Sequence, residues 1–166
     1  MLVDDRAHVD FLIALLDEVA ARFGQVLAVF YQPLDVAVFD VNRDGRVDFV
    51  LPNFGGSSMS YAEQIGLNSF SINTFSTNIT SPNRLAAADF NRDGRTDVIL
   101  ALNGGSLVIA KNTGMSGSSA FVTTATFSIT GQLMGIVTGD FNRDGETDVA
   151  VARFGTDDVT IRFGKK

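Results

Sequence analysis

The chain has 166 residues, of which 45% are hydrophobic and 19% are charged, with a formal net charge of −6, one histidine and no cysteine. A length and composition of this kind suit one domain with its own hydrophobic core, and the lack of cysteine excludes a disulfide framework and makes zinc a poor candidate metal. The negative charge without any basic stripe argues against a nucleic-acid partner, and no segment reaches the length of a membrane span.

The N-terminal segment, residues 1–24, differs from everything that follows. Apolar residues recur at helical spacing from Leu12 to Phe23, with Asp10, Asp17 and Glu18 towards the other side. This pattern predicts an amphipathic helix over residues 5–23, which Gly24 ends. We interpret the helix as a lid over one end of the fold and not as a helix that lies on a membrane surface.

Residues 25–166 have the pattern of β-strands. Residues 25–32 are expected to form one strand, which Pro33 closes. Residues 98–102 and 149–152 are apolar at every position, which is typical of a strand covered on both faces, whereas residues 159–163 alternate as a half-exposed strand does. Further strands are expected at 34–39, 47–51, 59–65, 70–75, 85–88, 96–102, 107–111, 121–129, 133–138, 147–152 and 159–163. About four strands per fifty residues predict an all-β fold of three four-stranded β-propeller blades.

A nine-residue motif occurs three times, at residues 40–48, 89–97 and 140–148, and reads D-x-N-x-D-G-x-x-D in each copy. A repeat of about fifty residues indicates a repeat architecture. Three carboxylates within nine residues repel one another unless a cation binds them, and Gly at position 6 permits the sharp turn that wraps the chain around one ion. The alternative is three Asp- and Gly-rich hairpin turns that bind no metal.

Oxygen ligands at positions 1, 3, 5 and 9, with a backbone carbonyl at position 7, suit calcium, which accepts irregular coordination by six to eight oxygen atoms. An EF-hand loop needs an acidic residue at position 12, where this chain has Leu51, Leu100 and Val151, so that interpretation fails. The predicted sites hold about three calcium ions per chain. They comprise Asp40, Asn42, Asp44, Arg46 and Asp48; Asp89, Asn91, Asp93, Arg95 and Asp97; and Asp140, Asn142, Asp144, Glu146 and Asp148.

The runs ADFNRDGRTDVILALN and GDFNRDGETDVAVARFGTDDVTIRFG resemble FG-GAP/VCBS-type repeats, the calcium-binding blades of integrin α-subunit propellers and of many secreted bacterial proteins. The resemblance covers roughly residues 25–166. It implies one calcium ion per loop, bound in the hairpin that joins the first two strands of a blade. It also implies an extracellular or cell-surface location, which the millimolar calcium outside cells favours.

The expected function is a calcium-stabilised, non-catalytic module for extracellular binding or adhesion, with a protein or glycan ligand that the sequence does not identify. An enzyme is disfavoured because His8 is the single histidine and the sequence has no serine elbow or phosphate-binding loop. A lectin is a weaker alternative, because the chain has no tryptophan and only two tyrosines for sugar platforms.

A self-assembling structural protein is the other alternative, and it follows from the strand count. The third repeat lacks an outer strand, and residues 25–32 can supply one. Within one chain this would close a ring of three blades, below the usual four to eight, whereas between chains the same strand covers the bare edge of a neighbour's third blade. We therefore predict a homo-oligomer, with two chains in a six-bladed ring as the leading geometry. If the rotation between chains does not close, the same contact builds a filament.

Overall fold

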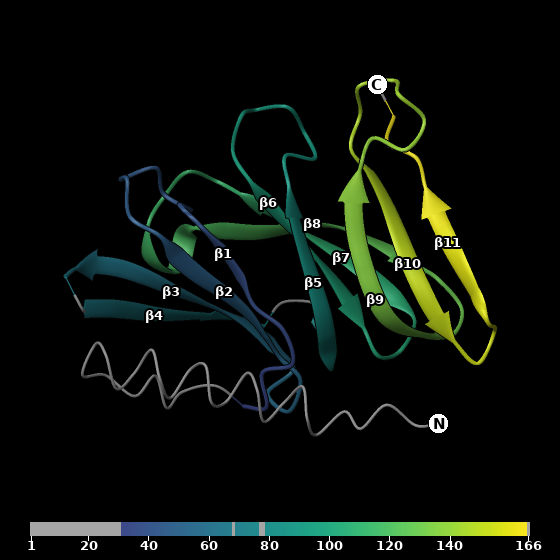
Figure 1. The fold of residues 1–166 in the computed structure, drawn as a ribbon. Coiled ribbons are helices and arrows are strands. Elements are labelled where there is room, and N and C mark those ends of the chain that lie inside the picture. Colours follow the sequence, from purple (N-terminus) through teal and green to yellow (C-terminus); the bar gives the residue numbers. More distant parts are fainter. Residues whose placement is uncertain (1–30, 68, 77–78, 166) are drawn as a thin grey trace.

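The computed structural model describes residues 31–67, 69–76 and 79–165, and this part of the chain is an all-β fold of three antiparallel sheets. The sheets follow one another along the chain, and the second lies between the first and the third (Figure 1). The first sheet comprises β1 (Ala37–Phe39), β2 (Asp48–Asn53), β3 (Ser58–Gly66) and β4 (Ser69–Phe75). The second comprises β5 (Pro82–Ala88), β6 (Asp97–Leu102), β7 (Ser106–Asn112) and β8 (Phe121–Ser128), which a 3-10 turn, η1 (Gly117–Ser119), precedes. The third comprises β9 (Gln132–Gly139), β10 (Asp148–Phe154) and β11 (Asp158–Arg162).

Each of the eleven strands expected between residues 34 and 163 is present, with ends that differ by a few residues. The order within each sheet follows the chain, so neighbouring strands are joined as a meander. The three-repeat, all-β prediction is therefore confirmed. The described sheets do not form a closed ring (Figure 1).

Two predictions concern the N-terminal part. The helix over residues 5–23 and the boundary at residue 24 lie outside the described residues, as do residues 25–30 of the first expected strand. The last two residues of that strand, Tyr31 and Gln32, form a bend, so the prediction of a strand is wrong there. Gln32 has a φ of 53°, which no extended strand allows, and the carbonyls of both residues accept hydrogen bonds from the β2–β3 turn.

The core is divided between the two spaces that separate the sheets. Along β6, Val98, Leu100 and Leu102 pack in a cluster with the first sheet, while Ile99 and Ala101 pack in a second cluster with the third sheet. Side chains of a strand point alternately to the two faces, so β6 is covered on both, as its continuous apolar sequence predicts. Each fully buried aliphatic side chain of this size contributes about 1.5–3 kcal/mol.

Aromatic contacts mark the space between the first and second sheets. Phe121, the first residue of β8, is buried, and its ring packs edge-on against Tyr61 at 5.9 Å and Phe75 at 5.8 Å between ring centroids. Such pairs add about 0.5–1.5 kcal/mol beyond the area that they bury. In the described part of the chain, no helix is long and apolar enough to cross a membrane.

Candidate metal centres

The three motifs form the loops between the first and second strands of each sheet, where the resemblance places them: 40–48 follows β1, 89–97 follows β5 and 140–148 follows β9. All three loops lie at the same end of the sheets, at the top of Figure 1. The sequence therefore brings its three candidate sites together along one edge of the molecule.

Within each loop, the side-chain oxygens at positions 1 and 3 converge on one backbone amide. In the second loop, Asp89 Oδ1 and Asn91 Oδ1 accept hydrogen bonds from the Asp93 amide at 3.2 and 2.9 Å. Asp89 Oδ2 accepts another from the Gly94 amide at 2.8 Å. The first and third loops repeat these contacts, with distances between 2.8 and 3.1 Å. The oxygens of positions 1 and 3 therefore lie beside position 5 on one side of each loop.

The turn depends on two residues with left-handed backbone. Gly94 has a φ of 79°, and Arg92, at position 4, has a φ of 58°. Glycine adopts this conformation without the steric penalty that other residues meet, which explains its place at position 6 of every motif. The backbone angle φ is likewise positive at positions 4 and 6 of the other two loops.

The carboxylate at position 9 has a structural role that sequence analysis did not anticipate. Asp97 is buried, and its carboxylate accepts hydrogen bonds from the amides of Asn112 at 2.8 Å and Phe90 at 3.3 Å. Asp48 and Asp148 are equally buried and bind the equivalent amides, at 2.8–2.9 Å. Position 9 thus ties the start of each loop to the last few residues of the third strand or to the chain just after that strand.

Burial determines the electrostatics of these carboxylates. It raises the pKa of Asp48 and of Asp97, and the hydrogen bonds from the backbone amides act in the opposite direction. Tyr61 donates a hydrogen bond to Asp48 at 3.2 Å, and burial raises the pKa of Tyr61 well above its usual range. The tyrosine hydroxyl therefore stays protonated and remains a donor.

Position 7 differs between the loops. Arg46 and Arg95 form ion pairs with the position 5 carboxylates of their own loops, Asp44 and Asp93. The third loop has Glu146 instead, which is nearly buried and pairs with Arg92 of the second loop at 2.9 Å. The first two loops each carry three carboxylates and two guanidinium groups, whereas the third carries four carboxylates and one guanidinium group. The third loop is therefore the most negative.

Arginines at position 4 connect successive loops. Arg43 donates to the carbonyl of Gly94, and Arg92 donates to the carbonyl of Gly145. The arginine is visible in all three motifs, but sequence analysis gave it no function. Its equivalent in the third loop, Arg143, has no following loop in the described part of the chain. Because of these contacts the three loops form one continuous ridge.

The first loop also receives a carboxylate from outside the motif. Glu63, on β3, is nearly buried and accepts hydrogen bonds from Asn42 Nδ2 at 2.9 Å and from the Gly117 amide at 3.0 Å. It therefore links the first loop to η1 of the second sheet. Sequence analysis missed this residue, because no spacing rule relates it to the motif.

Positions 1, 3 and 5 offer two carboxylates and one amide oxygen, a donor set that suits a hard cation such as calcium. No group of three or more His, Cys, Asp or Glu side chains that could hold a metal occurs among the described residues. Each loop has an asparagine at position 3, and its third carboxylate, at position 9, is engaged by backbone amides. The donor types at positions 1, 3 and 5 are therefore those that calcium prefers, and in the first two loops an arginine pairs with the position 5 carboxylate.

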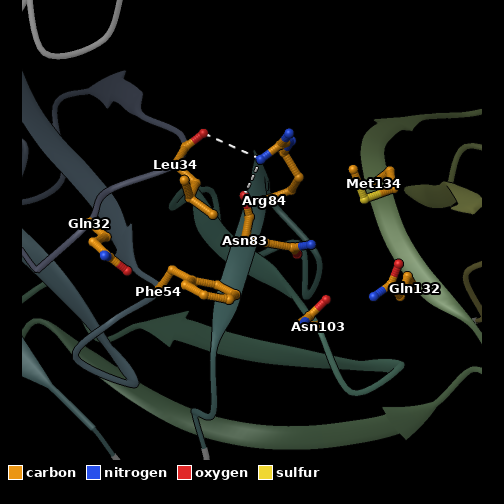
Figure 2. Close-up of a pocket in the computed structure, with 8 residues that line it drawn as sticks. All are labelled: Gln32, Leu34, Phe54, Asn83, Arg84, Asn103, Gln132 and Met134. Carbon is orange, nitrogen blue, oxygen red and sulfur yellow. Dashed lines mark hydrogen bonds between the residues drawn. The ribbon is translucent and has the colours of Figure 1, made fainter. Parts of the chain in front are cut away.

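A pocket of about 410 Å³ lies at the opposite end of the strands from the loops (Figure 2). It is lined by Asn83 and Arg84 of β5, by Gln132 and Met134 of β9, and by Gln32, Leu34, Phe54 and Asn103 from segments outside the strands. Arg84 donates to the carbonyls of Asn83 at 2.7 Å and Leu34 at 3.4 Å, and Asn83 Nδ2 donates to the Leu133 carbonyl at 2.6 Å.

Comparison with known protein families identifies a repeat that matches this chain. The model of the FG-GAP-like repeat matches residues 40–100 and 89–151. Each matched range begins at the first residue of a loop, and together they cover about two thirds of the chain. A search of curated proteins finds no match to the chain.

Proposed function

We propose that this chain, which belongs to the FG-GAP-like repeat family, is a calcium-stabilised, non-catalytic module of the β-propeller type that acts outside the cell in binding or adhesion. The observation that supports this proposal best is the repetition of one loop arrangement on three successive sheets, with the loops joined into one ridge by Arg43 and Arg92. A rigid ridge of loops on stacked sheets is a suitable surface for a protein or glycan ligand.

The residues at positions 1, 3 and 5 of each loop would hold the calcium ion, with the position 7 carbonyl and the position 9 carboxylate as the remaining candidates. When bound, calcium neutralises the carboxylates that each loop gathers. The chain itself contributes the shape of the loop: the position 5 and 6 amides orient the position 1 carboxylate, and the buried position 9 carboxylate fixes the loop to its sheet.

Metal analysis of protein prepared in calcium tests the proposal. We expect three ions per chain, with affinities on the order of 10⁻⁴ to 10⁻³ M as in other extracellular modules. The Asp93→Ala variant should lose one ion. The matched control is Asp158→Ala, which removes a carboxylate that pairs with Arg153 outside the loops. Fewer than two ions in the unmodified chain would refute the proposal.

Self-assembly is a second candidate function, which the outward face of the third sheet favours. Val159 and Ile161 are 63% and 45% exposed, whereas their equivalents in the first sheet, Met59 and Tyr61, are fully buried against the second sheet. We propose that this apolar face supports a homo-oligomer, either a two-chain ring or a filament. The mass of the chain in solution, measured with calcium and with a chelator, tests this candidate. A monomer under both conditions would exclude it.

A lectin remains the weaker proposal. Phe54 is the aromatic side chain among the residues that line the pocket in Figure 2, and sugar sites rely on larger aromatic platforms. A glycan array would identify such an activity directly.

A further inference from the structure

The first and second loops carry the same charged residues. Both motifs have aspartate at positions 1, 5 and 9 and arginine at positions 4 and 7. In both, the position 7 arginine pairs with the position 5 carboxylate. The Nε of that arginine donates to a carbonyl of the third strand, that of Gln64 at 2.6 Å in the first sheet and that of Asn112 at 2.9 Å in the second. A difference in charge between these two loops must therefore come from residues outside the motif.

One residue of the third strand differs in charge from repeat to repeat. The amides of Gln64 and Asn112 each donate to a position 9 carboxylate at 2.8 Å, so these two residues are equivalent. The residues that precede them are Glu63 and Lys111. In the third repeat the equivalent residue is Phe163, which carries no charge. The same place is therefore acidic beside the first loop and basic beside the second.

Glu63 is held against the first loop and is 7% exposed. Its Oε1 accepts a hydrogen bond from Asn42 Nδ2 at 2.9 Å, and its Oε2 accepts one from the Gly117 amide at 3.0 Å. Asn42 Oδ1 is thereby turned to the Asp44 amide, 3.1 Å away, which also donates to Asp40 Oδ1. Glu63 therefore orients the position 3 side chain and places a fourth carboxylate beside the loop.

Lys111 acts on the second loop in the opposite sense. Its Nζ lies 3.5 Å from Oδ2 of Asp93, the position 5 carboxylate, and the same oxygen pairs with Arg95. Asp93 therefore faces two cationic groups, and a divalent cation that binds this carboxylate must act against the charge of both. The lysine side chain is 38% exposed, so it can turn towards solvent at little cost, but it remains a positive charge beside the loop.

We infer that this third-strand residue sets the affinity of the neighbouring loop for a divalent cation, so that Glu63 strengthens the first site and Lys111 weakens the second. The inference rests on the calcium function proposed above. The two loops differ by two charge units at an equivalent place. Beside a divalent ion, a difference of this size corresponds to about a tenfold difference in affinity at physiological ionic strength. The first loop should therefore fill at calcium concentrations about ten times lower than the second.

Isothermal titration calorimetry of full-length chains with one intact loop of interest measures this order. Asp93→Ala combined with Asp144→Ala leaves the first loop intact, and Asp44→Ala combined with Asp144→Ala leaves the second. Each chain is titrated with calcium at a fixed salt concentration, after circular dichroism has shown that it is folded. We expect the Kd of the first loop to be about tenfold lower, and this difference should shrink as salt is added.

Variants of the third-strand residue assign the difference. With the second loop intact, Lys111→Gln should tighten calcium binding about threefold and Lys111→Glu about tenfold. Ser128→Glu is the control for Lys111→Gln, because it also makes the chain more negative by one unit. Ser128 is exposed and lies opposite Ser106, at the other end of β7 from Lys111, so this control should leave the affinity unchanged. With the first loop intact, Glu63→Gln should weaken binding about threefold.

A second measurement separates an electrostatic role of Lys111 from a structural one. Lys111→Gln should leave the unfolding midpoint in excess chelator unchanged, because a partly exposed ion pair contributes little to stability. A lower midpoint together with an unchanged calcium affinity would show that Lys111 serves the fold, and it would overturn the inference. The test does not depend on Glu63→Gln, which changes a nearly buried side chain.

The outcomes also separate this inference from the proposed function. Equal affinities of the first and second loops, or an unchanged affinity in Lys111→Glu, would overturn the inference and leave the proposed function standing. A preference for the first loop that Glu63→Gln and Lys111→Gln both reduce supports it. If the unmodified chain binds no calcium, the proposed function fails and the inference fails with it.

Discussion

Replacement of Asp97 by asparagine isolates the structural role of position 9. The Asp97 carboxylate is 1% exposed and accepts hydrogen bonds from the amides of Asn112 and Phe90, one through each oxygen. Asparagine has nearly the same size but offers one oxygen and one NH₂ group. The NH₂ group would face a backbone N–H, so one buried donor would lose its acceptor.

The expected cost follows from these contacts. A buried donor left without a partner costs about 1–3 kcal/mol. Burial raises the pKa of Asp97, which shows that the charged form is desolvated, and asparagine is relieved of that penalty. We therefore expect a net loss of about 1–2 kcal/mol in the free energy of unfolding. For a domain of this size, that loss lowers the unfolding midpoint by about 2–8 °C.

Thermal unfolding followed by circular dichroism, in excess calcium and in excess chelator, tests this reasoning. The loss should be present in chelator, because the two acceptors bind backbone amides and not an ion. Any further loss in calcium would measure the role of Asp97 as a metal ligand. Asp158→Asn, at an exposed ion pair with Arg153, is the control and should change little. An unchanged midpoint for Asp97→Asn in chelator would refute the argument.

Three further predictions concern the loops. Asp93→Ala should lower the unfolding midpoint more in calcium than in chelator, and equal drops would show that Asp93 serves the turn alone. Glu146→Arg changes the charge of the third loop by two units, which should weaken calcium binding by about 1–2 kcal/mol, or about tenfold, in calorimetry. Unchanged affinity would contradict it. Arg92→Ala, which removes both the bond to the Gly145 carbonyl and the ion pair with Glu146, should lower stability by about 0.5–1 kcal/mol in denaturant unfolding, whereas Arg143→Ala should not; equal effects would exclude the link between loops.

The strands could be predicted from the sequence because their signals are local. The apolar run at residues 98–102 and the alternation at residues 159–163 each report the environment of a single strand, and both strands are present. The bend at Tyr31 and Gln32 could not be predicted in this way. It depends on contacts with the β2–β3 turn and on a bridge between Pro33 and Asn53, which lie far apart in the sequence.

The same distinction applies to the loops. The oxygens at positions 1 and 3 and the glycine at position 6 act within nine residues, so their spacing predicted where they lie. The contacts of Asp97 with Asn112 and of Arg43 with Gly94 span 15 and 51 residues, and they depend on how the strands and sheets pack. The motif shows that a carboxylate is needed at position 9, but it does not show that backbone amides are among its partners.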